Sequence, residues 1–326
     1  MKISRRNAIL SVGALSLGAS WSSHANTWPT QPLKMVIGFS PGGAADLVGR
    51  ALAPEMQRQL GQPLIMDYRP GAGGAIAATA VARSSADGYL LYLADTGGMS
   101  VIPHLRQVGY DPVADFTPIS CLGSSGLVVL AHPQLPVTDI PSLIKLLKEK
   151  PDSHTYASSG LGSASHLATE LFKQMTGTQI QHIAYRGGAP ALTDLMAGTV
   201  NLGFATIAPA LQLIQAGKVR ALGVTSPKRS PSLPQVPTLV EQGVAAYDAT
   251  FWFAIVGPPR LPKAIASRLQ SAFATVLRDK EVVASLERLG SENVGPQTPE
   301  ALTQLLREDL AKWGRVIRTA NIKLEG

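Results

Sequence analysis

Short apolar runs alternate with helical patterns along most of this 326-residue chain, and turns rich in glycine, proline and serine separate them. The run over 33–38, for example, is followed by the turn Ser40-Pro41-Gly42-Gly43 and by a helical pattern over 44–60. We expect this helix to bend or restart at Pro54. Strands that alternate with helices form parallel sheets with helices packed on them. The pattern therefore predicts an α/β fold with largely parallel sheets.

The alternation falls into two blocks, and a helical tail follows the second block from Pro262 onward. Near 127–131 and 248–252 a strand pattern is bordered by irregular chain, and we expect the chain to cross between the blocks there. We predict two α/β lobes joined by a hinge, with 26–128 and 250–326 in lobe 1 and 129–249 in lobe 2.

The first 25 residues have the pattern of an export signal. Lys2, Arg5 and Arg6 precede an apolar stretch of about a dozen residues, which is shorter than the roughly 20 that span a bilayer. A small-residue site ends at Ala25, so we predict a signal peptide over 1–25 and a periplasmic protein. The adjacent arginines fit the Tat route, but Ala8 stands where Tat signals carry a bulky aromatic residue, so the Sec route is equally open.

Composition excludes several classes of protein. The formal charge is +7, and loss of the export signal removes three of these charges, so the mild remaining +4 does not favour nucleic acid. The single Cys121 excludes a disulfide framework, and the six histidines lack ligand spacing. We predict no metal, no cofactor and no nucleic-acid partner, and we expect Cys121 to be an inert core residue.

Four glycine-rich turns lead from predicted strands into predicted helices, at 39–46, 69–74, 158–166 and 185–188. A helix start offers free N–H groups and a partial positive charge to an anion, and glycine lets a ligand approach the backbone. One such turn is ordinary loop geometry, whereas two from opposite lobes can close on one small anion. Asp46 either stabilises its helix start or contacts a substrate amine or a water.

No catalytic signature accompanies these turns. The chain has no P-loop, no nucleophile elbow and no HExxH motif, and the glycines at 71–74 depart from a dinucleotide fingerprint at Ile76. An exported α/β hydrolase that uses Ser163 and His166 is an alternative without an identifiable partner carboxylate. The residues favour a binding protein with no catalytic residue.

Several motifs together resemble one protein family. The first turn has the order aromatic-x-Pro-Gly-Gly-x-x-Asp and is followed by Arg50, and the sequence Pro-Gly-Ala-Gly-Gly comes next at 70–74. Further matching motifs lie at 165–172, 185–194, 217–222 and 225–238. From its export signal to its end, the chain resembles the Bug family, the extracytoplasmic solute receptors of tripartite tricarboxylate transporters.

The resemblance implies a type II periplasmic-binding-protein fold whose two lobes close on a small solute, usually a carboxylate, held partly through ordered waters. It also implies the ligand-binding residues: Phe39, Ser40, Gly42, Gly43, Ala44 and Asp46 in lobe 1, facing Ser159, Gly160, Gly162, Ser163, Ser165 and His166 in lobe 2. One departure from the family pattern is Tyr68-Arg69 before the second turn, where Arg69 is a candidate for a second carboxylate.

The same resemblance implies partners: a mono-, di- or tricarboxylate ligand, and the large and small membrane subunits of a transporter. We expect a monomer. A sensory receptor that presents its ligand-bound form to a signalling protein is the alternative, because nothing in the chain separates the two roles. The solute itself stays open, because the distal pocket depends on proximity in three dimensions.

Overall fold

A computed structural model describes residues 28–185, 187–292, 294–295 and 297–323. The predicted export signal lies outside these residues. Within the described ranges, no helix combines the length and the apolar character that crossing a membrane requires.

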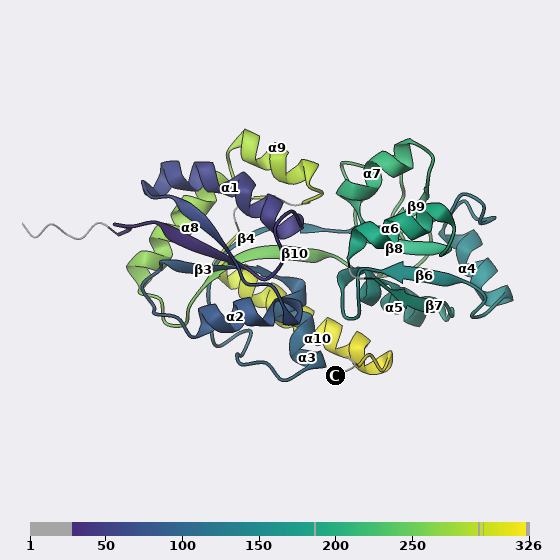
Figure 1. Ribbon diagram of the computed structural model, residues 1–326, viewed down its shortest axis with the longest axis horizontal. Coiled ribbons are helices and arrows are strands. Elements are labelled where there is room, and N and C mark those ends of the chain that lie inside the picture. Colours follow the sequence, from purple (N-terminus) through teal and green to yellow (C-terminus); the bar gives the residue numbers. More distant parts are fainter. Residues whose placement is uncertain (1–27, 186, 293, 296, 324–326) are drawn as a thin grey trace, which may run out of the picture.

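Two five-stranded sheets form the centres of two lobes, which lie end to end in Figure 1. We call the part around the first sheet lobe 1 and the part around the second sheet lobe 2. The first sheet has the order β2 (Leu64–Tyr68), β1 (Leu33–Ile37), β3 (Leu90–Asp95), β10 (Phe251–Gly257) and β4 (Thr117–Ser125). The second has the order β7 (Gln181–Ala184), β6 (Thr155–Ser158), β8 (Leu202–Thr206), β5 (Leu127–Ala131) and β9 (Arg220–Val224).

Helices cover both faces of the first sheet, because its central strands are apolar on both sides. Met35 of β1 faces one core, and its neighbour Val36 faces the other. The helices on the Met35 face are α1 (Ala44–Leu60), α8 (Lys263–Val276) and α9 (Lys280–Arg288). Those on the Val36 face are α2 (Ala75–Ala82), α3 (Ile102–Leu105) and α10 (Pro299–Thr319). Cys121 lies in this second core at 2% exposure, as an inert core residue would.

The second sheet is covered in the same way. Val129 of β5 faces one core and Val128 faces the other. On the Val129 face lie α4 (Ile140–Glu149) and α5 (Ala164–Thr176), and on the Val128 face lie α6 (Gly188–Ala197) and α7 (Ile207–Gln215). The alternation that the sequence shows is thus the alternation of strands and covering helices within each lobe.

In each sheet four strands run in one direction and a single strand opposes them. In lobe 1 this strand is β10, which is antiparallel to β3 and β4; in lobe 2 it is β5, which is antiparallel to β8 and β9. Both are the strands by which the chain enters a lobe from the other one. The sequence reading predicted largely parallel sheets but gave no sign of these two reversed strands.

Two local expectations need correction. The helix α1 runs without interruption through Pro54, so the expected restart there is wrong. Pro54 is exposed, and the buried Leu52 and Met56 on either side of it fix the helix against the sheet. The sequence reading also missed a π-helical turn, η2 (Gly97–Val101), and the short α3 that follows it.

Thr225 ties together the segments that connect the lobes. It is fully buried, and its N–H and Oγ1 form hydrogen bonds of 2.9 and 2.7 Å with the backbone of Leu127, where the chain enters lobe 2. Its Oγ1 also donates to the carbonyl of Ala249 (2.9 Å), and its own carbonyl accepts from Ala249 N–H (3.1 Å). The entry and exit of lobe 2 are therefore held side by side.

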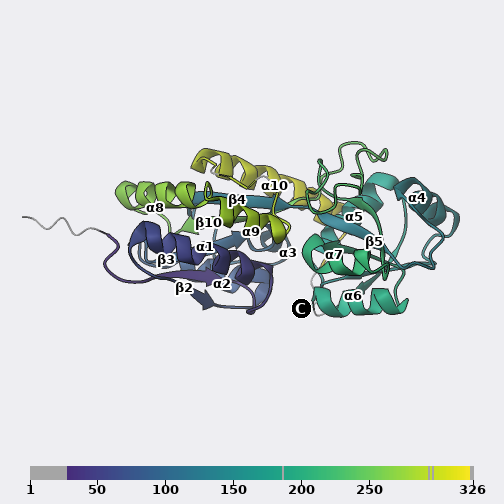
Figure 2. The same ribbon diagram turned by 90° about the horizontal axis from the view of Figure 1, so that it is seen from above.

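The long helix α10 packs on both lobes, as both views show (Figures 1 and 2). Near its start, Leu302 and Leu306 belong to a core of lobe 1. Near its end, Trp313 is buried in a core of lobe 2 and stacks on Phe251, with ring centroids 5.2 Å apart. The helix therefore spans the junction between the lobes.

We expect Trp313→Ala to lower the free energy of unfolding by about 3–5 kcal/mol, because it empties a fully buried site in the core. Chemical denaturation followed by circular dichroism measures this. The exposed neighbour Arg315 provides the control, and Arg315→Ala is expected to change stability by no more than about 0.5 kcal/mol. Equal effects of the two variants would contradict the role given to Trp313.

Candidate functional site

The strand register places the carboxyl edges of the two sheets opposite each other. Asp95, at the end of β3, pairs with Phe253 of β10, which pairs with Gly123 near the end of β4. Across the short connection that follows, Leu127 pairs with Thr206 at the end of β8. Strands parallel to β3 and β8 must end at the same edges. The turns after β1, β2 and β3 thus face the turns after β6, β7 and β8, in the middle of Figure 1.

Two packing contacts between the lobes confirm that these edges are adjacent. Gly290, just after α9, lies against the start of α7, where a Cβ on Gly290 would be 3.9 Å from Ile207 Cβ. On another side, Val101 of lobe 1 joins the core of lobe 2 that contains Trp313. The facing turns are therefore held at short range by packed elements.

The helices that begin at the facing edges have few side-chain caps. The N-cap residues of α1, α2, α6 and α7 make no side-chain hydrogen bond to their helix: Gly43, Gly74, Gly187 and Thr206. The start of α5, at the same edge, is capped by the Ser163 side chain. Elsewhere, side chains of Asp139, Asp279 and Thr298 cap α4, α9 and α10, and α8 has no side-chain cap. An uncapped helix start leaves N–H groups for water or for a ligand.

The buried side chain of Asp46 accepts a backbone N–H of the first turn and so fixes that turn from its buried side. Its carboxylate is 3% exposed and accepts hydrogen bonds from Gly42 N–H (2.8 Å), Arg50 Nε (2.7 Å) and the Tyr68 hydroxyl (2.6 Å). Burial raises the pKa of Asp46, but the bonds from Tyr68, Gly42 and Arg50 outweigh it, so the pKa lies below its ordinary value. With its acceptors occupied in this way, Asp46 supports the turn instead of facing outward.

The second turn packs directly on the end of β1. A Cβ on Gly38 would lie 2.7 Å from Gly74 Cα, so only glycine allows this approach of the two backbones. The turn includes a short 3-10 segment, η1 (Ala72–Gly74). Arg69 pairs with Asp67 through its Nη2 at 2.8 Å. The guanidinium that the sequence offered to a second carboxylate therefore already has an acidic partner.

The turn after β3 belongs to the same edge, although the sequence reading did not select it. Asp95 accepts hydrogen bonds from Gly98 N–H (3.0 Å) and the Tyr92 hydroxyl (3.3 Å), and the Tyr110 hydroxyl donates to the Gly98 carbonyl. Burial raises the pKa of Asp95 to about 6 despite these bonds. The signal that could have found this turn is the pair Gly97-Gly98 directly after an apolar strand, as in the other turns.

The third turn contains a chain of serine hydroxyls. Ser165 Oγ accepts from Ser159 N–H (2.9 Å) and lies 3.1 Å from Ser159 Oγ and 3.0 Å from Ser163 Oγ. Three hydroxyl hydrogens serve two oxygen–oxygen contacts, so one hydrogen is left over to donate elsewhere. Because Ser159 and Ser163 are partly exposed, this end of α5 can offer a hydroxyl donor to an anion.

His166 supports the third turn in the way that Asp46 supports the first. It is 4% exposed, its Nδ1 accepts from Gly162 N–H (3.0 Å), and its ring stacks on His182 at 4.2 Å. Burial, with smaller contributions from His182 and Lys173, lowers the pKa of His166 to about 3. The ring is therefore neutral at neutral pH, with its proton on Nε2.

The fourth turn follows β7, and Arg186 within it lies outside the described residues. Tyr185 donates its hydroxyl to Asp194 (2.7 Å), and its N–H bonds to the carbonyl of Ser158 beside the third turn. A Cβ on Gly187 would meet no atom within 4 Å, so the start of α6 is open. The third and fourth turns are thus adjacent at the edge of lobe 2.

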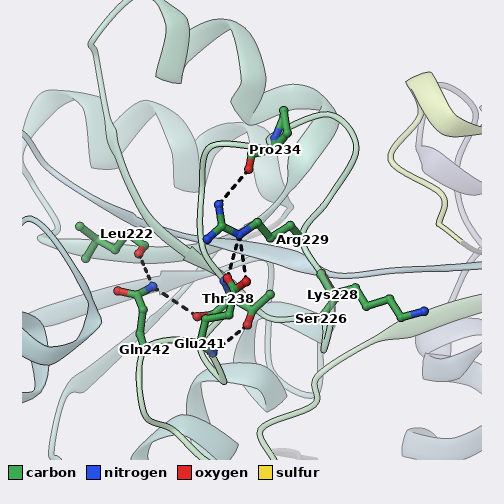
Figure 3. Close-up of polar contacts among 8 residues, drawn as sticks. All are labelled: Leu222, Ser226, Lys228, Arg229, Pro234, Thr238, Glu241 and Gln242. Atoms are coloured by element: carbon green, nitrogen blue, oxygen red, sulfur yellow. Dashed lines mark hydrogen bonds and ion pairs between the residues drawn. The ribbon is translucent and has the colours of Figure 1, made fainter.

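One of the motifs noted in the sequence follows β9 and holds a loop together (Figure 3). Arg229 Nε donates to the carboxylate of Glu241, which also accepts from Thr238 N–H (2.8 Å). Gln242 Nε2 donates to the carbonyl of Leu222 (2.9 Å). These bonds fold the segment after β9 onto lobe 2, which gives this motif a structural role.

Two surface hollows, of about 360 and 520 Å³, lie away from the facing edges, by the starts of β1 and β3 and of β9. Neither hollow is lined by a residue of the glycine-rich turns. Among the described residues, no group of three His, Cys, Asp or Glu side chains is arranged to hold a metal ion.

Comparison with known proteins now decides the family. Residues 48–322 match the model of the tripartite tricarboxylate transporter family receptor, TctC. The chain belongs to this family. It is also 33% identical to the protein BugT of Bordetella pertussis over 330 residues, which cover 100% of both chains.

Solved structures of periplasmic receptors are similar to this chain over most of its length. The Rhodopseudomonas palustris protein with bound adipate is 35% identical, with a TM-score of 0.81 over 91% of this chain and 99% of its own. The periplasmic binding protein BugD is 32% identical, with a TM-score of 0.78 over 91% and 100%. MatC from R. palustris with bound malate is 30% identical, with a TM-score of 0.77 over 89% and 99%. The predicted two-lobe periplasmic-binding-protein fold is therefore confirmed.

The neutral His166 makes stability depend on pH. The unfolded chain takes up a proton at this histidine near pH 6.5, but the folded protein does so only near pH 3. The contribution of His166 to the free energy of unfolding is therefore fully present above about pH 6.5. It is lost as the pH falls toward 3, at up to about 1.4 kcal/mol per pH unit.

We expect His166→Asn to reduce this dependence between pH 6.5 and 5, because asparagine keeps an acceptor for Gly162 N–H but does not titrate. The dependence that remains has the same sign, because burial also lowers the pKa of His182. His166→Ala, which loses the acceptor, should be less stable by about 1–3 kcal/mol at pH 8 as well. Urea denaturation at a series of pH values measures both effects. A slope in His166→Asn equal to that of the native chain would refute the assignment.

Proposed function

We propose that this receptor binds a small carboxylate between its lobes and delivers it to a membrane transporter. The observation that carries the proposal is the set of uncapped helix starts, from both lobes, at edges that face each other. Relatives of the same fold have bound adipate and malate, both carboxylates. A carboxylate suits free N–H and O–H donors at helix starts because it accepts hydrogen bonds and carries negative charge.

We assign two kinds of role to the twelve expected binding residues. Asp46 and His166 position their turns from beneath, since each accepts an N–H of its own turn. Eight of the remaining ten are exposed or partly exposed and supply the surface that meets the ligand: Phe39, Ser40, Gly42, Gly43, Ala44, Ser159, Gly160 and Ser163. The buried Gly162 and Ser165 lie directly behind this surface. This division follows from burial and hydrogen bonding, which the family resemblance alone does not distinguish.

We infer that lobe closure adds to the binding energy that the helix starts supply. A micromolar ligand needs about −8 kcal/mol, whereas a helix start supplies about 0.3–2 kcal/mol. The ligand must therefore bind the closed arrangement better than the open one. We propose that 26–128 and 250–326 move as one lobe and 129–249 as the other, with the connections at Gly126 and at 249–250, which Thr225 joins, as the hinge. The end of α10, which packs on lobe 2, must adjust during this motion.

The geometry opposes the hydrolase alternative. Ser163 Oγ accepts the backbone N–H of His166 (3.4 Å) and thereby caps α5, while Nδ1 of that ring is occupied by Gly162 N–H. With its pKa lowered to about 3, this imidazole is a weak general base. We therefore propose a receptor without catalysis, present as a monomer, that delivers its solute to one large and one small membrane subunit. A sensory partner is the second candidate for the same ligand-bound form.

We further propose that the chain is exported by the Sec or Tat route and cleaved after Ala25. The mature protein, isolated from the periplasm of a Gram-negative bacterium that expresses the full chain, should begin at Asn26 by intact-mass analysis. A mass that includes 1–25 would contradict the export signal. Blocking the Tat system alone then distinguishes the two routes.

A panel of mono-, di- and tricarboxylates should contain at least one compound that raises the melting temperature of the purified mature protein. Binding at a concentration of 100 Kd adds about 2.7 kcal/mol to the stability of the folded state. Neutral amides of the same acids are the control and should have no effect. A panel without any stabiliser, and purified protein without a trapped ligand, would remove the carboxylate assignment.

The cleanest variant of the site is Gly43→Val. Gly43 has φ −84°, which valine adopts, and a Cβ there would meet only the Ser40 carbonyl oxygen at 3.7 Å. We expect an unchanged melting temperature without ligand and at least a hundredfold loss of affinity by calorimetry, because the side chain covers the start of α1. Gly160 is less suitable because its φ of 132° strains any other residue. Native affinity in Gly43→Val would place the site elsewhere.

A further inference from the structure

His182 lies behind the third turn, although the sequence reading did not select it. It belongs to β7, and its Nε2 is 2.6 Å from the hydroxyl oxygen of Ser158, the last residue of β6. The same hydroxyl oxygen accepts from Gly160 N–H (3.1 Å) and lies 3.2 Å from the Gly160 carbonyl oxygen. His182 is therefore joined, through one buried hydroxyl, to a glycine that we expect to meet the ligand.

A count of hydrogens places a proton on His182 Nε2. The Ser158 hydroxyl has one hydrogen and two lone pairs, and Gly160 N–H occupies one of the lone pairs. If Nε2 carries a hydrogen, it donates to the second lone pair. The hydroxyl hydrogen then donates to the Gly160 carbonyl, and all three contacts are hydrogen bonds. If Nε2 carries none, the hydroxyl hydrogen turns to Nε2 and leaves the two oxygens 3.2 Å apart with no hydrogen between them.

The other ring nitrogen of His182 can take up a further proton without any change in this turn. Among the described residues no group bonds to its Nδ1, which is not one of the buried atoms that lack a partner, and the ring is half-buried. A proton there leaves the bonds through Ser158 in place and adds a positive charge. His166 differs, because its Nδ1 accepts from Gly162 N–H and a proton on it would break that bond. Of the two stacked rings, His182 is thus the one that can be charged.

The titratable groups that face His182 lie on β6 and α5. Besides His166, these are Tyr156, whose ring stacks on that of His182 at 4.8 Å, and the ion pair of Glu170 and Lys173. Tyr156 donates to Glu170 (2.9 Å) and stays neutral, since burial raises its pKa. Burial lowers the pKa of His182, Glu170 acts in the opposite direction, and Lys173 lowers it further. His182 is therefore neutral at neutral pH in the protein without ligand.

We propose that His182 takes up a proton when a carboxylate binds at the third turn. This inference rests on the proposed function, which places a carboxylate at that turn. The negative ligand attracts an imidazolium behind Ser158 and Gly160, and exclusion of water on closure strengthens the attraction. The ligand thus favours the protonated ring, and by linkage the protonated ring favours the ligand. The affinity for a carboxylate then rises as the pH falls from 8 toward 6.

Calorimetric titration of the mature protein with adipate and with malate, at pH 6 and at pH 8, tests this coupling. The carboxyl groups of both acids are largely ionised at both pH values. We expect the dissociation constant to be about threefold lower at pH 6, since a ligand that raises the pKa of His182 by one unit changes affinity by up to about tenfold. If neither acid binds, the strongest stabiliser of the carboxylate panel takes their place.

Two variants test the residue. His182→Gln keeps an N–H for Ser158 but does not titrate, so its dissociation constants at the two pH values should differ less than twofold. The matched control is His132→Gln, because His132 follows β5 at the end of that strand farthest from Leu127 and the facing turns. This control should keep the threefold ratio of the native chain.

A second measurement on the native chain does not depend on how the variants fold. Calorimetry at pH 6 in two buffers with different heats of ionisation counts the protons exchanged on binding. We expect a net uptake of protons. The ligand cannot supply this result, because an acid that binds as its anion releases protons.

The outcomes separate this inference from the proposed function. Equal dissociation constants at the two pH values, no net proton uptake, or a native ratio in His182→Gln would overturn the coupling and leave a carboxylate receptor. A failure of adipate, malate and the wider carboxylate panel to bind at either pH would overturn the proposed function and this inference with it.

Discussion

The two sheets face each other because Thr225 joins the points where the chain enters and leaves lobe 2. Its bonds to Leu127 and Ala249 are buried, and a buried backbone group without such a partner would cost about 1–3 kcal/mol. With both passages held side by side, β5 and β10 must run away from the junction into their lobes. Each therefore opposes the strands beside it, which end at the junction. The arrangement of every turn at the facing edges follows from this constraint.

Buried acceptors support the turns at these edges. Asp46, Asp95 and His166 each accept the N–H of a glycine in the turn above, at Gly42, Gly98 and Gly162. The acceptor fixes one N–H inward and so fixes the turn; at the turn above His166, the Ser163 side chain also caps α5. In α1 and α2 the helix start itself stays uncapped. A rigid turn with free donors is the arrangement that an anion receptor needs, because little ordering remains to be done on binding.

Much of the fold was accessible from sequence because its signals are local. Apolar runs gave the strands, and glycines at 42–43, 71–74 and 160–162 gave the turns that lead into helices. The prediction of a restart at Pro54 was wrong because the effect of a proline depends on which side of the helix faces solvent. The packing of Leu52 and Met56 decides this. The turn at Gly97-Gly98 was missed although it carries the same glycine signal. The reversed strands β5 and β10 have no local signal at all, since strand direction within a sheet depends on how the chain returns to it.

The sequence by itself determined the family, the two-lobe α/β architecture and the turns that bear the candidate binding residues. Only the tertiary structure decided which of these residues face outward and which work from beneath. Asp46 and Arg69 are candidate ligand contacts in the sequence. In the structure Asp46 is bonded to Tyr68, the last residue of β2, and Arg69 is paired with Asp67 of the same strand. His182 was not selected from the sequence, and it matters because β7 places it beside Ser158 of β6. The physical reason is that pairing, burial and exposure are properties of neighbours in space, which residue spacing along the chain does not specify.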